Sequence, residues 1–565
     1  ATRVDASQLI EKGRENLLLQ SNQFDTTWSS VNSSVTSGQS GYDSSNDAWI
    51  FTKTSGSGTT ASLRQIISSN GTQTFSVYAK KGSLDWLALI VIGSSNPEAY
   101  FDLANGTLGS TNNGAISSSI YDAGNGWYRC SIVLNESLTQ VRIYTANDDN
   151  VANGAAGNIL IQDAQLEQGL VATPYIETGA TTAQAGILEN TPRFDYSGGA
   201  TCPSLLLEPS RTNLVTQSEY PEGYAAAFRG SFNTNAAISP QGVQNASLFT
   251  EDTTSNNTHF YAVTSLSWVA GTTYTISVYV KSNGRSIVLT QGNQNVINFT
   301  TYFNLTTGEV GNSNASNASI ENVGNGWYRC SVTQTALTTS GTNILINAWD
   351  EEEWNYTYTG NGVSGFYSYG HQIEAGSYKT SYIPTYGVSQ TRAADLCLGA
   401  GNSSLFNVNS GVVFGEFAAL SDDLTFRQFG IVGTTGNEVN LSLDSVSNRI
   451  GGIVRSGGTY YTTNYVVTDT TQVNKVALKY EGSDVKLFVN GFLVDTNTTA
   501  SAPQSLSEFN FAIGTNNSNK FFGKINQALV FPTALSDLDL EILTGATTYN
   551  TFAEMALALN YTVYE

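Results

Sequence analysis

The chain has 565 residues, of which 13% are charged and 40% hydrophobic, and it contains 53 glycines. This length exceeds what one hydrophobic core supports, and the low charge with abundant Gly, Asn, Ser and Thr is typical of several all-β modules. The 46 acidic and 25 basic residues give a formal net charge of −21, which disfavours nucleic acid and anionic membrane surfaces as partners.

The start of the chain, ATRVDASQLIEKGREN, lacks the apolar core of a signal peptide. No stretch of the sequence approaches the roughly 20 consecutive apolar residues of a membrane-spanning helix. We therefore expect no membrane insertion. Residues 1–15 lie outside the repeats described next and are predicted to be an attachment segment.

An internal repeat follows, marked by the heptapeptide GNGWYRC at 124–130 and again at 324–330. The sequences around the first copy return in the same order around the second. The matching pairs are NLLLQSNQF and NLVTQSEY, FSVYAKKG and ISVYVKSNG, YFDLANGTLG and YFNLTTGEVG, and QLEQG and QIEAG. This order indicates one folding unit used twice.

The boundaries of the two copies follow from their offset. It grows only from 197 residues, at Asn16 and Asn213, to 207 residues at QLEQG and QIEAG. The sequence predicts modules at 16–178 and 213–386, joined by a linker at 179–212.

Alternation within the repeat predicts strands. In SVYAK, Val77 and Ala79 share one face and Tyr78 lies on the other. YFDLANGTLG places turn residues between two apolar stretches, as in a hairpin. In the heptapeptide the glycines take the turn, and Cys130 is expected to face inward because Cys is among the most buried residue types. Both modules are therefore predicted to be antiparallel β-sandwiches.

A third module is predicted at 405–545, after a linker at 387–404. Its clearest hairpin is VKLFVNGFLV, where Asn490-Gly491 supplies a two-residue turn. Ser536 is placed to cap a short helix, and 546–565 is predicted to be a helical tail. The expected fold class is all-β: three antiparallel sandwiches in tandem, of jelly-roll and concanavalin-like type, with short helices at the C-terminus.

Four cysteines in a chain of this length do not make a disulfide scaffold. Cys130 and Cys330 occupy equivalent places in the two copies and cannot meet if the copies form separate cores. Cys202 and Cys397 are the remaining candidates for a bridge.

Glycan binding on a β-sandwich needs an exposed aromatic ring and nearby polar groups. Trp127 and Trp327 have identical contexts, so they are expected to serve the shared fold. The copies differ where the second carries NAWDEEEWNYTYTGNG and the first YTANDDNVANGAAG. The predicted glycan-binding residues are Trp349, Asp350, Trp354, Tyr356 and Tyr358. The alternative is a loop that packs against a neighbouring domain or subunit.

Acidic loops supply the metal candidates. Asp148, Asp149, Glu351 and Glu352 offer the hard oxygen ligands that suit Ca²⁺, the one cofactor considered. No calcium-loop spacing is present, and acidic loops on a chain this negative are typical of a solvated surface.

Catalytic motifs are missing from the sequence. His259 and His371 are its two histidines, HExxH and GxSxG are absent, and no E-x-D occurs from which a glucanase-type ExDxxE could be built. We expect a protein that is not an enzyme. A polysaccharide-degrading enzyme with appended binding modules is an alternative that would need an acid pair from distant strands.

The order NLL-x-x-S, SVYxK, YFxLxxGxxG, GNGWYRCS and QLExG-x-x-x-T-x-YI resembles the carbohydrate-binding-module-like jelly-roll domains of tailed-bacteriophage head spikes, head fibres and tail fibres. VKLFVNGFLV and KFFGKINQALVFPTALSDLDLEILTG resemble the concanavalin A-like, laminin-G-type sandwich.

These resemblances imply a virion structural protein on the particle surface that adheres to host-surface or environmental glycans. Phage capsid or tail proteins would be its partners, and a homo-oligomer, with a trimer favoured, its state. A secreted or surface bacterial adhesin is the alternative, which would need a signal peptide or a sorting tail.

Overall fold

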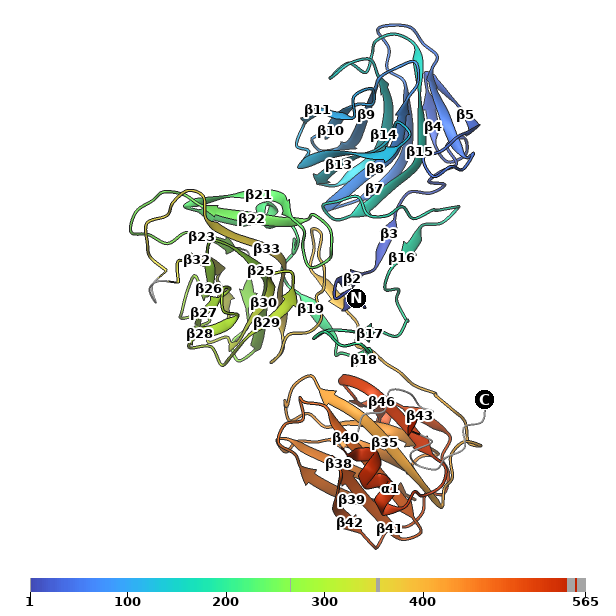
Figure 1. The fold of residues 1–565 in the computed structure, drawn as a ribbon, viewed down its shortest axis with the longest axis vertical. Coiled ribbons are helices and arrows are strands. Elements are labelled where there is room, and N and C mark those ends of the chain that lie inside the picture. Colours follow the sequence, from blue (N-terminus) through green and yellow to red (C-terminus); the bar gives the residue numbers. More distant parts are fainter. Residues whose placement is uncertain (1, 265, 352–355, 546–553, 556–565) are drawn as a thin grey trace. The chain divides into compact units, whose positions relative to one another are not determined.

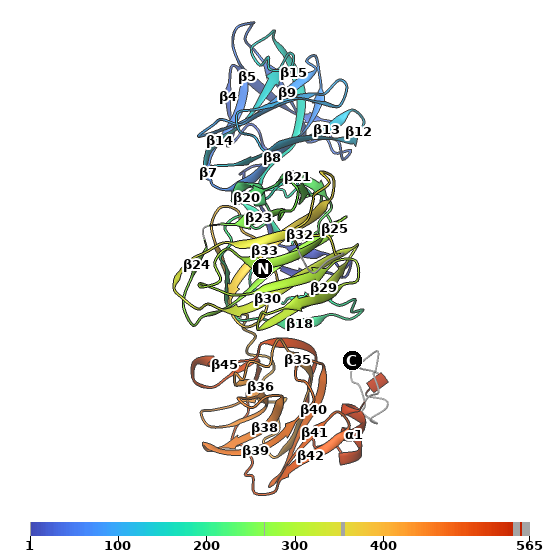
Figure 2. The ribbon, with the colours of Figure 1, turned by 90° about the vertical axis from the view of Figure 1, so that its left-hand side faces the viewer.

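The computed structural model of the protein describes residues 2–264, 266–351, 356–545 and 554–555 (Figures 1 and 2). The described residues form antiparallel β-sandwiches and a short α-helix, α1 (Asp537–Thr544), which confirms the predicted all-β class. They include no helix long and apolar enough to cross a membrane. The chain divides into two compact units: Ala1–Arg3, Ser7–Thr191 and Thr212–Thr391 in the first, Val4–Ala6, Pro192–Arg211 and Arg392–Glu565 in the second.

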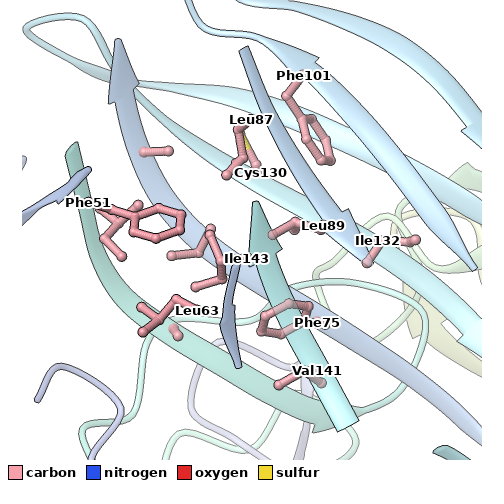
Figure 3. Close-up of a cluster of buried hydrophobic side chains, with 14 of the residues drawn as sticks. Phe51, Leu63, Phe75, Leu87, Leu89, Phe101, Cys130, Ile132, Val141 and Ile143 are labelled. Carbon is pink, nitrogen blue, oxygen red and sulfur yellow. The ribbon is translucent and has the colours of Figure 1, made fainter. Parts of the chain in front are cut away.

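The first module is a sandwich of two antiparallel sheets. One sheet has the order β11 (Thr107–Asn112), β10 (Glu98–Asp102), β9 (Trp86–Gly93), β14 (Leu138–Ala146), β7 (Ser62–Ser69), β4 (Ser29–Val31). The other has the order β12 (Ser117–Gly124), β13 (Trp127–Asn135), β8 (Thr72–Lys81), β15 (Gly157–Gln168), β6 (Ala48–Lys53), β5 (Ser33–Gln39). Phe51, Phe75 and Cys130 are fully buried between them (Figure 3). Val77 and Ala79 also enter this core, as the alternation predicts.

The second module has the same strand order. One sheet runs β28 (Glu309–Ser313), β27 (Thr300–Asn304), β26 (Ser286–Gln291), β32 (Ile344–Trp349), β23 (Phe260–Val263), β20 (Ala225–Phe228). The other runs β29 (Asn317–Gly324), β30 (Trp327–Thr335), β25 (Thr273–Asn283), β33 (Gly365–Ala375), β22 (Ala246–Glu251), β21 (Gly230–Ala237). Two short strands, β24 (Ser267–Trp268) and β31 (Ser340–Gly341), pair separately. Each heptapeptide thus begins at a turn and continues into the equivalent strand, β13 or β30.

Of residues 1–15, expected to be an attachment segment, residues 1–3 and 7–15 belong to the first unit and Val4–Ala6 to the second. They form β1 (Thr2–Val4), β2 (Ile10–Lys12) and, with Asn16, β3 (Arg14–Asn16), which pairs with β16 (Ala183–Ala185). Ile10 joins a buried aromatic cluster with Trp327. The Lys12 Nζ lies 2.8 Å from an oxygen of Glu219, which is 1% exposed. An attachment role for this segment remains a prediction.

The third sandwich draws part of one sheet from the predicted linker 179–212. That sheet has the order β17 (Phe194–Asp195), β18 (Ser204–Leu207), β46 (Gly523–Phe531), β35 (Ser410–Ala419), β40 (Asn474–Glu481), β41 (Asp484–Val489), β42 (Phe492–Asn497). Leu207 enters the core of this sandwich. Segments of two and four residues are too short to show a strand period, so the sequence prediction treated them as linker. A further pair, β19 (Arg211–Asn213) and β34 (Gln390–Arg392), follows.

The opposite sheet of the third sandwich completes this fold. Its order is β39 (Thr459–Val466), β38 (Arg449–Ser456), β37 (Glu438–Leu443), β36 (Arg427–Val432), β45 (Asn519–Lys520), β44 (Ala512–Ile513), with β43 (Glu508–Asn510) also on β36. The β41–β42 hairpin turns at Asn490 and Gly491, which both have positive φ, as predicted. The Ser536 side chain caps α1 by accepting a hydrogen bond from the Asp539 amide. The tail predicted at 546–565 lies outside the described residues, except for 554–555.

All four cysteines are free. Cys130 and Cys330 are buried, and burial raises the pKa of each thiol well above its ordinary value. Cys202 is exposed and Cys397 half-buried, and neither forms the bridge that was considered.

Candidate functional site

Two aromatic residues predicted to bind glycans, Trp349 and Tyr356, pack against Tyr302 of the second sandwich. Trp349 is 2% exposed, and its ring meets that of Tyr302 edge-on, with centroids 5.0 Å apart. Tyr356 is half-buried against the same Tyr302 ring, at 6.1 Å. Trp349 therefore has no face free to stack on a sugar. Two further candidates, Trp354 and Glu352, lie outside the described residues.

Asp350 and Tyr358 belong to an anchor beneath this loop. Glu251, 2% exposed, accepts two hydrogen bonds of 2.9 Å from the Arg285 guanidinium. Arg285 Nη1 also donates to Asp350 at 3.0 Å, and Tyr358 Oη donates to Glu251 at 2.5 Å. Burial and the neighbouring Glu251 carboxylate raise the pKa of Tyr358. These contacts fasten both ends of the loop to the sandwich that carries it, whereas the alternative to glycan binding was packing against a neighbouring domain or subunit.

The metal candidates do not converge. Asp148 and Asp149 belong to the first sandwich, whereas Glu351 belongs to the second. The Asp149 carboxylate already accepts hydrogen bonds of 2.7 Å from the amide and hydroxyl of Ser110. Glu351 accepts bonds from two hydroxyl groups. Across the described part of the chain, no group of three or more His, Cys, Asp or Glu is placed to hold a metal ion.

Both histidines are buried. His371 lies 2.7 Å from the hydroxyl of Tyr261, and burial lowers the pKa of its imidazole to about 4. His259 Nδ1 lies 2.9 Å from the carbonyl oxygen of Arg229. These rings serve as polar members of the second sandwich, because neither reaches solvent.

Exposed aromatic rings gather instead at one side of the third sandwich. The edge strands β39 and β42, one from each sheet, lie next to each other in both views (Figures 1 and 2). The exposed fractions are 71% for Phe492, 54% for Tyr460 and 43% for Tyr465. The name β39–β42 strip is used for the exposed residues Tyr460, Thr462, Asn464, Tyr465 and Phe492 of these two strands. They do not share one face, because Tyr465 and Phe492 are in register with the core residues Ile450 and Val489, whereas Tyr460, Thr462 and Asn464 project from the outer face of β39. The strip therefore combines exposed aromatic rings with polar side chains on two neighbouring edge strands.

The strip arises from the alternation of an edge strand. Tyr461 packs against the core and Thr463 is buried, so Tyr460, Thr462 and Asn464 face outward. Arg455, which is in register with Tyr460 on β38, holds its guanidinium carbon 4.4 Å from the centre of the tyrosine ring. This cation–π contact orients the exposed ring.

Polar groups on the strip are available to a ligand. The Thr462 hydroxyl and the Asn464 amide are exposed, and neither side chain has a hydrogen-bond partner among the described residues. The backbone of Asn464 is held in place, because its N–H donates to Asp495 on β42 at 2.8 Å. Aromatic faces beside free hydroxyl and amide groups meet the chemical requirements for a sugar ring.

The sequence pattern alone does not single out this strip. The sequence feature that marks the strip is the run TYYTTNYVV, in which tyrosine recurs among polar residues. Only the topology shows that β39 is an edge strand with one face exposed, because period-two alternation is the same at the edge and in the middle of a sheet.

Residues 418–541 match the family model of the concanavalin A-like lectin/glucanases superfamily, and this range contains the whole strip. No curated protein matches the chain.

Solved structures with local likeness include a leech intramolecular trans-sialidase, 22% identical over 28% of this chain, with a TM-score of 0.23. The match spans 27% of the length of that enzyme. A tandem CBM22-1–CBM22-2 domain of Paenibacillus barcinonensis Xyn10C is 12% identical over 64% of this chain and 98% of its own, with a TM-score of 0.21. Domains LG4-5 of the mouse laminin alpha1 chain are 11% identical over 50% of this chain and 90% of their own, with a TM-score of 0.20. TM-scores of this size establish no common fold for the whole chain.

Proposed function

We propose that the protein is a non-enzymatic structural component of a tailed-phage particle, a head fibre, spike or tail fibre, that adheres to glycans through its third sandwich. The observation that carries the adhesive role is the β39–β42 strip, with exposed rings and with hydroxyl and amide groups that have no side-chain partner among the described residues. The match of residues 418–541 to a lectin-containing superfamily supports it. The phage assignment rests on the resemblance of both repeats to phage jelly-roll domains.

In this function each strip makes a weak contact. Exposed rings stack on the C–H faces of a host-surface or environmental glycan, and Thr462 and Asn464 bond its hydroxyls. Many copies on one particle would raise the avidity without new contacts at any single site. The protein would be attached to capsid or tail proteins at the virion surface, as a homo-oligomer with a trimer favoured.

Glycan-array binding by the full chain tests the adhesive role. Tyr460→Ala and Phe492→Ala should each weaken binding of neutral oligosaccharides about tenfold, because each removes a stacking ring. The matched control is Tyr121→Ala, which removes a tyrosine of intermediate exposure, 62% against 54% for Tyr460 and 71% for Phe492, from the first sandwich. The proposal is refuted if both strip variants bind glycans as the wild type does. It is also refuted if the variants change the oligomeric mass measured by sedimentation while their glycan binding stays the same.

Density-banded phage particles test the location. The protein should band with the virions, and antibody labels should mark their surface. Its absence from purified virions would overturn the phage assignment.

The non-enzymatic part of the proposal is tested by incubating the full chain with a glycan panel. No release of reducing ends is expected, because the described residues offer two buried histidines and the sequence no ExDxxE strand. Sugar release that survives repurification would favour a polysaccharide-degrading enzyme.

A further inference from the structure

Two arginines stand side by side on the solvent face of the first sandwich. Arg64 on β7 and Arg142 on β14 are direct partners in the register of adjacent strands. Their neighbours Leu63 and Ile143 are fully buried, so the alternation turns both arginines to the opposite face. Residues facing each other across strands have Cα atoms roughly 5 Å apart, which brings the two cationic side chains together.

Neither arginine is neutralised. Arg142 donates to the amide oxygen of Gln140 at 2.5 Å and to the hydroxyl of Tyr144 at 3.0 Å, both uncharged groups. The Arg64 side chain has no hydrogen-bond or ion-pair partner in the described part of the chain. Like charges that face each other across strands destabilise a sheet. The chain has 46 acidic residues, yet none of those in the described structure forms an ion pair with either arginine, so a stabilising role in the sheet does not explain the pair.

The fold does not require these arginines, since the second sandwich lacks them. In both copies the tyrosine of the YF landmark begins a row across the sheet: Tyr100, Ala88 and Tyr144 in the first, Tyr302, Val288 and Asn347 in the second. Two residues before Tyr144 and Asn347 stand Arg142 and Leu345. The partner of Leu345 on the next strand is Ala262, where the first copy has Arg64.

The surroundings of the pair offer apolar contact. Ile66, the partner of Gln140, is 83% exposed, and Ile90, the other partner of Arg142, is half-buried. A ligand on this face would meet two guanidinium groups, the Gln140 amide, the Tyr144 hydroxyl and aliphatic side chains. The carboxylate of Glu98, in register with Ile90, stands at the far end of the same row.

We propose that Arg64 and Arg142 form a second glycan site, which binds anionic oligosaccharides through their carboxylate or sulfate groups. The paired guanidinium groups supply charge-assisted hydrogen bonds to the acid groups, and the isoleucines contact the C–H faces of the sugars. A glycan as the occupant rests on the proposed adhesive function, whereas its negative charge rests on the arginine pair itself. Nucleic acid fits less well, because its dense phosphates would meet the net charge of −21.

The test measures the affinity of the full chain for three probes: an alginate hexasaccharide with carboxylates, a chondroitin sulfate hexasaccharide, and neutral cellohexaose. At least one acidic probe should bind, and more weakly as salt is raised, because salt screens exposed charges. The double variant Arg64→Ala, Arg142→Leu installs the residues of the second sandwich, which that fold accommodates. It should lower the affinity for the acidic probe at least about tenfold.

Controls separate this site from the strip. Lys81→Ala removes an exposed cation from the other sheet of the same sandwich and should leave the acidic probe bound. Tyr460→Ala should reduce binding of neutral oligosaccharides alone. The proposal is overturned if neither acidic probe binds, or if the double variant binds as the wild type does. Equal binding of a polyaspartate peptide or a DNA duplex would overturn the assignment to glycans.

Discussion

Residues that recur in both repeats hold buried polar groups together. Asn16 donates through its amide to the carbonyl oxygens of Ala164 and Ile176, and its side-chain oxygen accepts from two backbone amides. Asn213 makes the same four bonds in the second copy. Because unpaired polar groups are costly in a core, such residues repeat for the sake of the fold.

One buried carboxyl gives the first sandwich a pH dependence. Asp163 is 5% exposed, and burial, with Asp47 and Asp43 nearby, raises its pKa to about 7 despite a hydrogen bond from Tyr42. The pKa of Asp163 in the folded protein thus lies above its ordinary value of 3.8. Its contribution to stability is therefore fully present below that value and is lost as the pH rises through about 7. Asp163→Asn should remove a loss on the order of a few kcal/mol between pH 5 and pH 8.

Urea midpoints of the full chain at the two pH values measure this difference. Asp163 has a φ of 54°, which Asn also adopts readily, so the variant keeps the backbone. Titrating groups that do not interact with Asp163 contribute equally to both proteins and cancel in the comparison. The same pH dependence in wild type and variant would show that Asp163 is not the group responsible.

The tryptophans of the heptapeptide provide a matched pair. Trp127 and Trp327 are each 1% exposed, and Trp327 Nε1 donates to the carbonyl of Ile238 at 3.0 Å. No such bond is formed by Trp127 in the described structure. Trp327→Phe should therefore destabilise its sandwich by about 1 kcal/mol more than Trp127→Phe, the value of one hydrogen bond. Chemical denaturation of the full chain compares them, and equal losses would contradict this reading.

At the scale of elements, the repeat and its strands could be predicted from the sequence. The solvent exposure of the aromatic side chains on those strands could not. SVYAK carries its own alternation, so the faces of Val77 and Tyr78 follow from local sequence. The difference between the copies points to Trp349, yet it is buried, since it is the last residue of β32 and its ring packs against Tyr302 on the same sheet. The β39–β42 strip depends on which strands end a sheet, a property of distant pairing rather than local pattern.

The loop anchor of the second sandwich is an element whose strength can be measured. Arg285→Met would leave Glu251 without its cation at 2% exposure, and breaking a buried pair from one side costs about 3–5 kcal/mol. Adding Glu251→Gln should recover part of the loss. The control is Arg449→Met, which breaks a more exposed pair with Asp444 and should change the urea midpoint little. Equal effects of Arg285→Met and Arg449→Met would contradict the anchoring role.

At the scale of the whole molecule, each of the three sandwiches in the described residues has its own large apolar core. Leu89 lies in the first, Leu289 in the second and Leu487 in the third, all fully buried. The positions of the first two are equivalent in the repeat, which explains why a single sequence pattern predicted two domains. Because each core is closed within its own pair of sheets, damage to one should remain local.

Calorimetry of the full chain tests this independence. Leu89→Ala and Leu487→Ala each leave a cavity expected to cost about 2–5 kcal/mol, which lowers a melting transition by several degrees in a domain of this size. Each variant should move a different transition and leave the other in place. If the chain instead melted as one cooperative unit, both substitutions would shift the same transition by similar amounts. Distinct shifts would mean that ligands of the strip and of the arginine pair each stabilise only the sandwich that binds them, since binding stabilises the folded state it selects.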